Sequence, residues 1–207
     1  MSDADHNAVN SQITLQIPRS YTIASFAGAV GNVSALARIA EAVANPFDGK
    51  RCLTLKDDVS CDALSWASRN GHQDVVAFLL SRDADVESKS YGGMRPLHHA
   101  AQAYDDVIIR NLLAQKADPN MGDDAGNTAF HYTCKRGVLN LCQLLADAKA
   151  DTSKKNNAGM TPLFLACTYG QVRILGGGGG ARTGKGRTDQ YPPCKKREGA
   201  HEHSPNV

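Results

Sequence analysis

The chain has 207 residues, of which 42% are hydrophobic and 21% are charged, and its formal net charge is +2 at pH 7. The apolar fraction is enough for a real core, but so small a net charge argues against nucleic acid as a partner of the whole chain. No apolar stretch reaches the roughly 18–20 residues of a membrane helix. We therefore expect neither a nucleic acid nor a membrane as partner.

The first 20 residues form a polar leader, residues 1–20, with Asp3, Asp5 and His6 near its start. A signal peptide would carry a basic start followed by an apolar block, and the leader has neither. The six cysteines of the chain include no C-x-x-C pair, so free thiols in a reducing compartment are expected. These features predict an intracellular protein in the cytoplasm, the nucleus or both.

The middle of the chain repeats itself with a step of 33 residues. Four similar blocks begin at Asp62, Arg95, Thr128 and Thr161. Each block is followed by a small residue: Ala67, Ala100, Thr133 and Ala166. The ninth place after each start holds Gly71, Tyr104, Gly137 and Gly170. An apolar pair follows in each unit, and the complete units close with Ala-Asp.

This pattern resembles the ankyrin repeat, a unit of about 33 residues that carries T-P-L-H-x-A. The resemblance covers about residues 57–175, and a degenerate unit begins at Thr22, 40 residues before Asp62, with an insertion of 7 residues near 45–50. It implies an all-α ankyrin-repeat solenoid of stacked helix-turn-helix units with β-turn fingers. We expect this repeat domain to span residues 21–175, with about four to five repeats and an incomplete last one.

The repeat chemistry also predicts where the helices begin and end. Threonine at the block start caps the first helix, proline fits its first turn, and glycine at the ninth place ends it. Asp62 and Arg95 replace the capping threonine, and Tyr104 replaces the helix-ending glycine. We expect the unit that begins at Arg95 to turn less tightly at Tyr104.

The last segment, residues 176–207, holds eight of the 19 glycines and is rich in basic residues. Such a composition predicts a disordered, low-complexity tail. The repeat pattern stops in mid-unit after Leu175, so a frameshift, read-through or truncated splice form is one origin of the tail, and a functional flexible tail is the other. Gly179 to Lys185 spell most of a phosphate loop, but the required Ser or Thr, strand and helix are missing.

Histidine and cysteine side chains raise the question of a metal site or a catalytic site. His98 and His131 occupy the histidine position of the repeat, where the resemblance implies a structural role in bonding turn backbone. Cys134 falls at a small-residue core position, and no ligand spacing matches a zinc site. A Cys–His nucleophile would also need an orienting group and an oxyanion site. We expect no metal, no cofactor and no enzymatic activity.

The resemblance implies that the chain binds another protein through a concave surface of turn tips and first-helix faces. The variable positions of the family, carried onto this chain, are Asp58, Arg69, Asn70, Tyr91, Met94, Gln102, Asp124, Asn127, Lys135, Arg136, Asn157, Met160 and Tyr169. Tyr91 and Tyr169 are the expected anchors, and Arg69 and Arg136 come next. We expect a monomeric adaptor. The alternative is the regulatory part of a larger protein, such as an acyltransferase, a kinase or a channel.

Overall fold

The computed structural model describes residues 20–42 and 53–171, and within these residues the protein is all-α, with no strand. Most of the predicted leader, the predicted insertion at 45–50 and the predicted tail at 176–207 lie outside the described residues. The helices come in antiparallel pairs, apart from a short 3-10 turn and an unpaired last helix. Their bounds are α2 Ile23–Val30, α3 Val33–Ala42, α5 Ala63–Asn70, α6 Gln73–Ser81, η1 Tyr91–Gly93, α7 Pro96–Ala103, α8 Asp106–Ala114, α9 Ala129–Arg136, α10 Leu139–Asp147 and α11 Pro162–Thr168.

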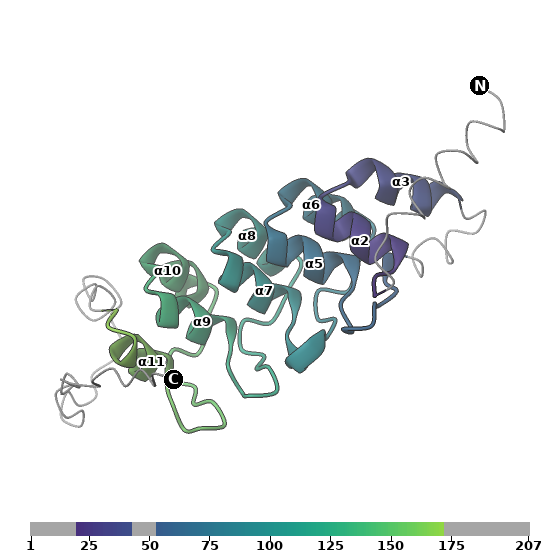
Figure 1. Ribbon diagram of the computed structural model, residues 1–207. Helices are drawn as coiled ribbons and strands as arrows, with labels where there is room; N and C mark the ends of the chain where they lie inside the picture. Colours follow the sequence, from purple (N-terminus) through teal and green to yellow (C-terminus); the bar gives the residue numbers. More distant parts are fainter. Residues whose placement is uncertain (1–19, 43–52, 172–207) are drawn as a thin grey trace, which may run out of the picture.

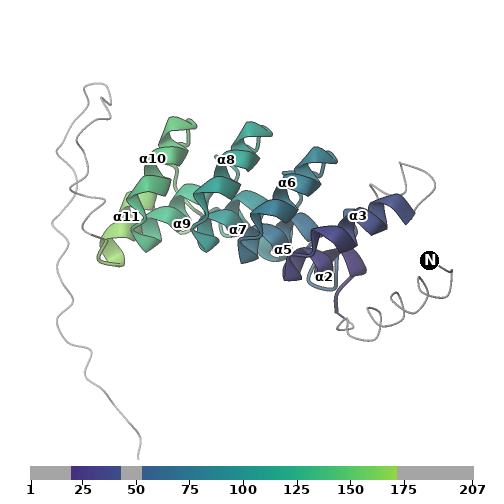
Figure 2. The same cartoon turned by 90° about the horizontal axis from the view of Figure 1, so that it is seen from above.

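The helix pairs stack side by side into an elongated array with two rows of helices (Figure 1). The first helix of each pair packs against the first helix of the next pair, in the order α2, α5, α7, α9 and α11. The second helices form the other row, and Figure 2 shows α6, α8 and α10 above α5, α7 and α9. The loops that join one pair to the next project together beside the first helices, and we call them finger loops. This arrangement confirms the all-α solenoid that the repeat pattern predicts.

The substituted block starts still begin their helices, by different means. Asp62 Oδ1 accepts a hydrogen bond from the backbone N–H of Ser65 at 2.8 Å, as a capping threonine would. Arg95 lacks an acceptor, and its own backbone N–H donates to His98 Nδ1 at 2.9 Å. Its buried guanidinium instead contacts Glu87 Oε2 at 2.8 Å and donates from Nη1 to the carbonyl of Gly122 at 3.0 Å. The arginine therefore connects two finger loops.

The first helix of each complete pair ends at a residue in the left-handed region. Gly71 and Gly137 adopt this conformation, with φ values of 77° and 80°. Tyr104 adopts it as well, with φ 61° and ψ 28°, and its N–H donates to Ala100 O, just as Gly71 donates to Ala67 O. The expectation of a looser turn at Tyr104 is therefore wrong. A side chain in this conformation costs roughly 1–2 kcal/mol, and the turn keeps the same geometry regardless.

The core lies between the two helix rows and runs through the whole described array. The second helices supply fully buried aliphatic side chains, among them Val76, Ile109 and Leu141. Small residues on the first helices let neighbouring pairs approach closely. At Gly28 of α2, an added Cβ would lie 2.5 Å from the carbonyl oxygen of Ala63, so only glycine permits this contact with α5.

Two buried histidines join successive units. His98 Nδ1 accepts from the Arg95 N–H, and His98 Nε2 lies 3.0 Å from the carbonyl of Met121 in the next finger loop. His131 repeats the arrangement, with Nδ1 beside Thr128 and Nε2 3.2 Å from the Met160 carbonyl. Burial lowers the pKa of both rings, so the neutral ring accepts at Nδ1 and donates at Nε2. This confirms the structural role implied for these two residues.

Candidate functional site

The side of the array formed by the first helices and the finger loops is the candidate site, and we call it the inner surface. Its loops are held in shape by a carboxylate five residues before a block start. Asp57 Oδ1 accepts from the N–H groups of Val59 and Cys61 at 3.1 and 2.8 Å. Asp57 Oδ2 accepts from the indole Nε1 of Trp66 on α5 at 2.6 Å. The Asp57 side chain thus holds the loop in one conformation and orients the Trp66 ring.

The same set of hydrogen bonds, which we call the loop brace, recurs two units later. Asp123 Oδ1 accepts from the N–H groups of Ala125 and Asn127 at 2.9 and 2.8 Å, and Asp123 Oδ2 accepts from the Tyr132 hydroxyl on α9 at 2.5 Å. Burial and the Asp123 carboxylate raise the pKa of Tyr132, which keeps its hydroxyl protonated as a donor. Asn156 makes the matching backbone bonds in the last finger loop. The inner surface is therefore preorganised by its own backbone and side chains.

Three depressions follow one another along the inner surface. The first, which we call the aromatic depression, has a volume of about 290 Å³. Its lining comprises Ser20, Tyr21, Asp57, Val59, Cys61, Trp66, Arg69, Ser90, Tyr91, Met94 and His99. Tyr21 and Trp66 lie with ring centroids 5.2 Å apart, and Tyr91 leaves 79% of its surface exposed. This end of the inner surface is thus mainly aromatic and apolar.

One residue that lines the aromatic depression, His99, is uncharged at neutral pH. His99 is 3% exposed, and burial lowers its pKa to about 4, with the nearby Arg69 and His98 acting in the same direction. The Ser90 hydroxyl donates to the Met94 carbonyl at 2.9 Å, so it accepts from His99 Nε2 at 2.8 Å. His99 Nδ1 has no hydrogen-bond partner among the described residues.

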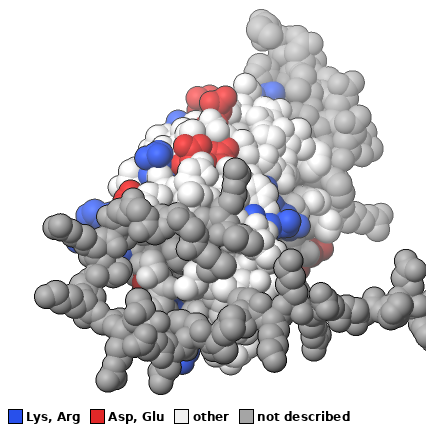
Figure 3. Space-filling view, turned by 90° about the vertical axis from the view of Figure 1, so that its left-hand side faces the viewer, with Lys and Arg blue, Asp and Glu red and all other residues white. Residues whose placement is uncertain are grey.

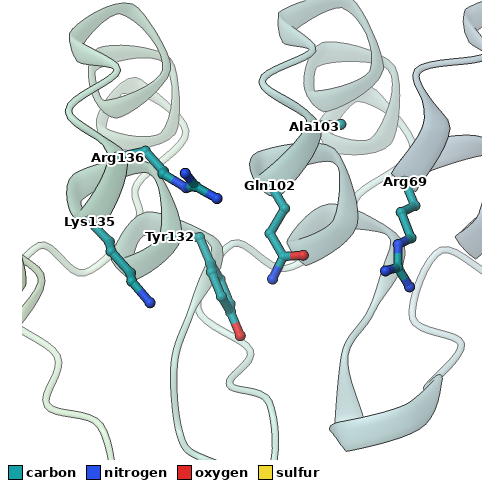
Figure 4. Close-up of a pocket in the computed structure, with 6 residues that line it drawn as sticks. All are labelled: Arg69, Gln102, Ala103, Tyr132, Lys135 and Arg136. Atoms are coloured by element: carbon teal, nitrogen blue, oxygen red, sulfur yellow. The ribbon is translucent and has the colours of Figure 1, made fainter. Parts of the chain in front are cut away.

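The second or basic depression, of about 310 Å³, adjoins the first through the shared residue Arg69. Its lining residues come from α5, α7 and α9 and are Arg69, Gln102, Ala103, Tyr132, Lys135 and Arg136. Figure 4 shows these side chains extending into the space beside the first helices, with Arg136 directed toward Gln102. Three different helix pairs thus contribute to one polar, cationic surface.

The third or terminal depression, of about 540 Å³, adjoins the second through Tyr132 and Lys135. It lies between the last two finger loops, α9 and α11. Five of the predicted binding residues line it, namely Asn127, Lys135, Asn157, Met160 and Tyr169. The Asn157 amide also donates to the Asp124 carbonyl at 2.9 Å, which ties the two finger loops together.

The structure places ten of the thirteen predicted binding residues in the lining of these depressions. The other three lie elsewhere. The amide of Asn70 donates to the Ala29 carbonyl of α2 at 2.7 Å. The backbone N–H groups of Asp58 and Asp124 donate to the carbonyls of Ser20 and Gly92. These contacts join neighbouring units, and the assignment of all thirteen residues to a partner interface stays a prediction.

Three aromatic residues of the inner surface were absent from the sequence-based prediction: Tyr21, Trp66 and Tyr132. Trp66 and Tyr132 stand four residues after a block start, a place that the T-P-L-H-x-A pattern leaves unspecified. The sequence does contain a pattern from which the position of both rings could have been predicted. Asp57 and Asp123 lie nine residues before the rings that they bond, and Ser90 lies nine residues before His99, the ring that it contacts in the unit between them.

Each cation of the basic depression lies over an aromatic ring. Arg69 lies 5.4 Å from the Trp66 ring centroid, and Lys135 lies 4.7 Å from that of Tyr169. Arg136 lies 5.7 Å from the Tyr104 ring. Seen from the α11 end, acidic side chains gather near the upper edge, where Figure 1 places the second helices, with cationic side chains beside them, and a further cationic group lies lower on the right (Figure 3). The charge is thus unevenly divided around the array.

Within residues 20–42 and 53–171, no helix has the length and apolar character needed to cross a membrane. The same residues include no cluster of three or more potential metal ligands.

The comparisons with known proteins agree with this architecture. A family model described as "Ankyrin repeats (3 copies)" matches residues 24–121 and 97–176, more than half of the chain. A probable serine/threonine-protein kinase of Dictyostelium discoideum is 29% identical over 68% of this chain and 18% of its own length. The B-cell lymphoma 3 protein homolog of Mus musculus is 34% identical over 56% of this chain and 26% of its own length. The human SH3 and multiple ankyrin repeat domains protein 2 is 31% identical over 49% of this chain and 6% of its own length. The matched region thus makes up about a quarter or less of each relative.

Proposed function

Because the chain belongs to the ankyrin repeat family, whose repeats form a protein-interaction module, we propose that it binds a protein partner through its inner surface and catalyses no reaction itself. The observation that carries this proposal is the run of three adjoining depressions across α5, α7, α9 and α11. A fold by itself does not define a function, so the proposal rests on this surface.

The composition of the inner surface supports a protein as the ligand. Tyrosine, tryptophan, methionine and arginine are the residues that protein interfaces use most, and all four types line the aromatic depression. Tyr91 and Tyr169 are 79% and 54% exposed, which leaves large apolar rings in water when no partner is present. We propose Tyr91, Tyr169, Arg69 and Arg136 as the residues that contribute most to binding.

Site-specific crosslinking tests which side of the array meets the partner. A photoreactive amino acid replaces Gln102 on α7, or Gln143 on α10 as the matched control on the second-helix row, because both glutamines are exposed. After irradiation in cells, crosslinked proteins are expected at position 102 and not at 143. Crosslinks confined to position 143 would contradict the proposal.

A pair of double variants then tests the proposed residues. Tyr91→Ala with Arg136→Ala is expected to weaken binding of the crosslinked partner with helicity unchanged. Val107→Ala with Arg110→Ala on α8 is the control, since it removes an exposed apolar and an exposed cationic side chain from the other row. Equal retention of the partner by both double variants would show that the assigned residues are wrong.

A second candidate function is the regulatory part of a larger protein. One relative is a probable kinase in which the matched region makes up 18% of the length. Sequencing transcripts through the codon for Leu175 tests this candidate, because a catalytic domain in the same frame would support it. We further propose that the chain is a monomer in the cytoplasm, the nucleus or both, which light scattering and imaging of the tagged chain would test.

A further inference from the structure

The three cations of the basic depression have no carboxylate partner within the described part of the chain. The ion pairs found there join Arg95 to Glu87 and Arg110 to Asp106, and neither involves Arg69, Lys135 or Arg136. No acidic residue lines the basic depression or the terminal depression. The inner surface therefore carries three positive charges that the rest of the described structure does not neutralise.

Aromatic rings hold these cations in place. Arg69 lies over Trp66, Lys135 over Tyr169 and Arg136 over Tyr104, at 4.7 to 5.7 Å from the ring centroids. A cation stacked on a ring face keeps N–H donors available at its outer side and loses less conformational freedom when it binds. Such donors form charge-assisted hydrogen bonds with carboxylates. The arrangement suits a ligand that brings several negative charges.

The aromatic depression beside these cations suits an apolar group instead. Its one carboxylate, Asp57, is buried and already accepts hydrogen bonds at both oxygens. Its lining includes Trp66, Tyr91, Met94 and the neutral His99 ring. Arg69 lines both depressions, so an apolar side chain and a carboxylate can lie side by side.

We propose that the inner surface binds an acidic segment of a protein partner, which places an aromatic or aliphatic side chain against Trp66 and Tyr91 and its carboxylates at Arg69, Lys135 and Arg136. This inference rests on the proposed function and adds the chemistry of the partner. A nucleic acid fits less well, because the exposed carboxylates of Asp58 and Asp124 on the finger loops would repel a continuous phosphate backbone.

The test begins with a peptide library displayed on phage and selected on the full chain. Enriched peptides are expected to combine Asp or Glu with a nearby aromatic or aliphatic residue. One such peptide is then synthesised with two matched controls, one with its acids changed to lysine and one with its apolar anchor changed to alanine. Trp66 is the one tryptophan of the chain, so its fluorescence reports directly on the aromatic depression.

Two triple variants test which cations bind the acidic peptide. Arg69→Gln, Lys135→Gln and Arg136→Gln together are expected to weaken the acidic peptide at least about tenfold, which corresponds to about 1.4 kcal/mol. The control, on exposed residues away from the depressions, combines Arg82→Gln, Arg110→Gln and Lys116→Gln and removes the same charge. It is expected to change the affinity less than about twofold, because exposed distant charges are screened by salt.

Several results would overturn the inference. Selected peptides without acidic residues, or equal weakening by the two triple variants, would show that the three cations do not recognise carboxylates. Labelled single-stranded DNA that bound the same cations more tightly than the peptide would replace the acidic segment with a nucleic acid. Crosslinks at position 102 together with neutral selected peptides would leave the proposed function standing and reject the partner chemistry, whereas crosslinks at position 143 alone would reject both.

Discussion

Acidification is expected to weaken the fold through one buried side chain, His99. Burial lowers its pKa in the folded protein to about 4, against 6.5 for an unperturbed histidine. Between these two values the unfolded chain binds more protons than the folded one. Stability is therefore lost as the pH falls below 6.5, and the loss is complete below about pH 4.

The size of the effect follows from the two pKa values. A shift of this size is worth about 3 kcal/mol when complete, and about 2 kcal/mol of it is lost between about pH 7.5 and about pH 5. His99 is almost fully buried, so solvent screening reduces this value little. Because small domains are stable by only about 5–15 kcal/mol, the loss is large enough to measure.

The variant His99→Leu isolates this contribution. Leu165 holds the equivalent place in the last unit and is buried there, so leucine fits the helix position. Urea unfolding followed by circular dichroism at several pH values gives the free energy of unfolding of both proteins. The wild-type protein is expected to lose about 2 kcal/mol more than the variant between about pH 7.5 and about pH 5. His98 and His131 titrate in the same direction but are present in both proteins, so they cancel. If the free energies of unfolding of the two proteins fell equally between these pH values, the reasoning would be refuted.

Further predictions concern the loop brace and the core. Asp123→Ala removes the acceptor of two backbone N–H groups and of a hydroxyl, and is expected to cost about 2–4 kcal/mol in the free energy of unfolding. Asp123→Asn is expected to cost less than about 1 kcal/mol, because Asn156 makes the same backbone bonds in its own loop. Urea unfolding measures the stability of both variants. Equal losses of stability in the two would contradict the role given to the Asp123 side chain. Leu141→Ala on α10 is expected to cost about 2–5 kcal/mol, and the exposed Leu139→Ala on the same helix less than about 1 kcal/mol, measured by the same assay.

The repeat period was sufficient to predict the helix pairs, since the spacing of apolar and small residues determines which faces pack. The sequence did not predict the conformation of Tyr104. A tyrosine ordinarily avoids the left-handed region, but here the packing of α7 against its neighbours and the bond to the Ala100 carbonyl impose the same turn as at the glycines. A local preference of about 1–2 kcal/mol is small against the burial of two helices.

The candidate surface was predictable in part. Position within the repeat predicted the residues that line the depressions, because a shared backbone places equivalent residues on the same side. It could not predict that Asn70 uses its amide to bond α2, since that contact spans the boundary with a degenerate unit. It also missed Trp66 and Tyr132, whose orientation depends on acceptors in the preceding loops and not on helix periodicity.

The histidine contacts between units also bear on how the inner surface adapts to a ligand. His98 and His131 each bond the next finger loop, whereas the equivalent residue on α5 is Ser65, whose buried hydroxyl has no partner among the described residues. The junction between α5 and the following unit thus lacks one hydrogen bond between units that the later junctions have. The aromatic depression spans this junction, with Trp66 on one side and Tyr91 on the other. We expect its width to vary with the side chain that enters, so that the apolar anchor of the partner can differ in size while Lys135 and Arg136, both on α9, keep a fixed spacing.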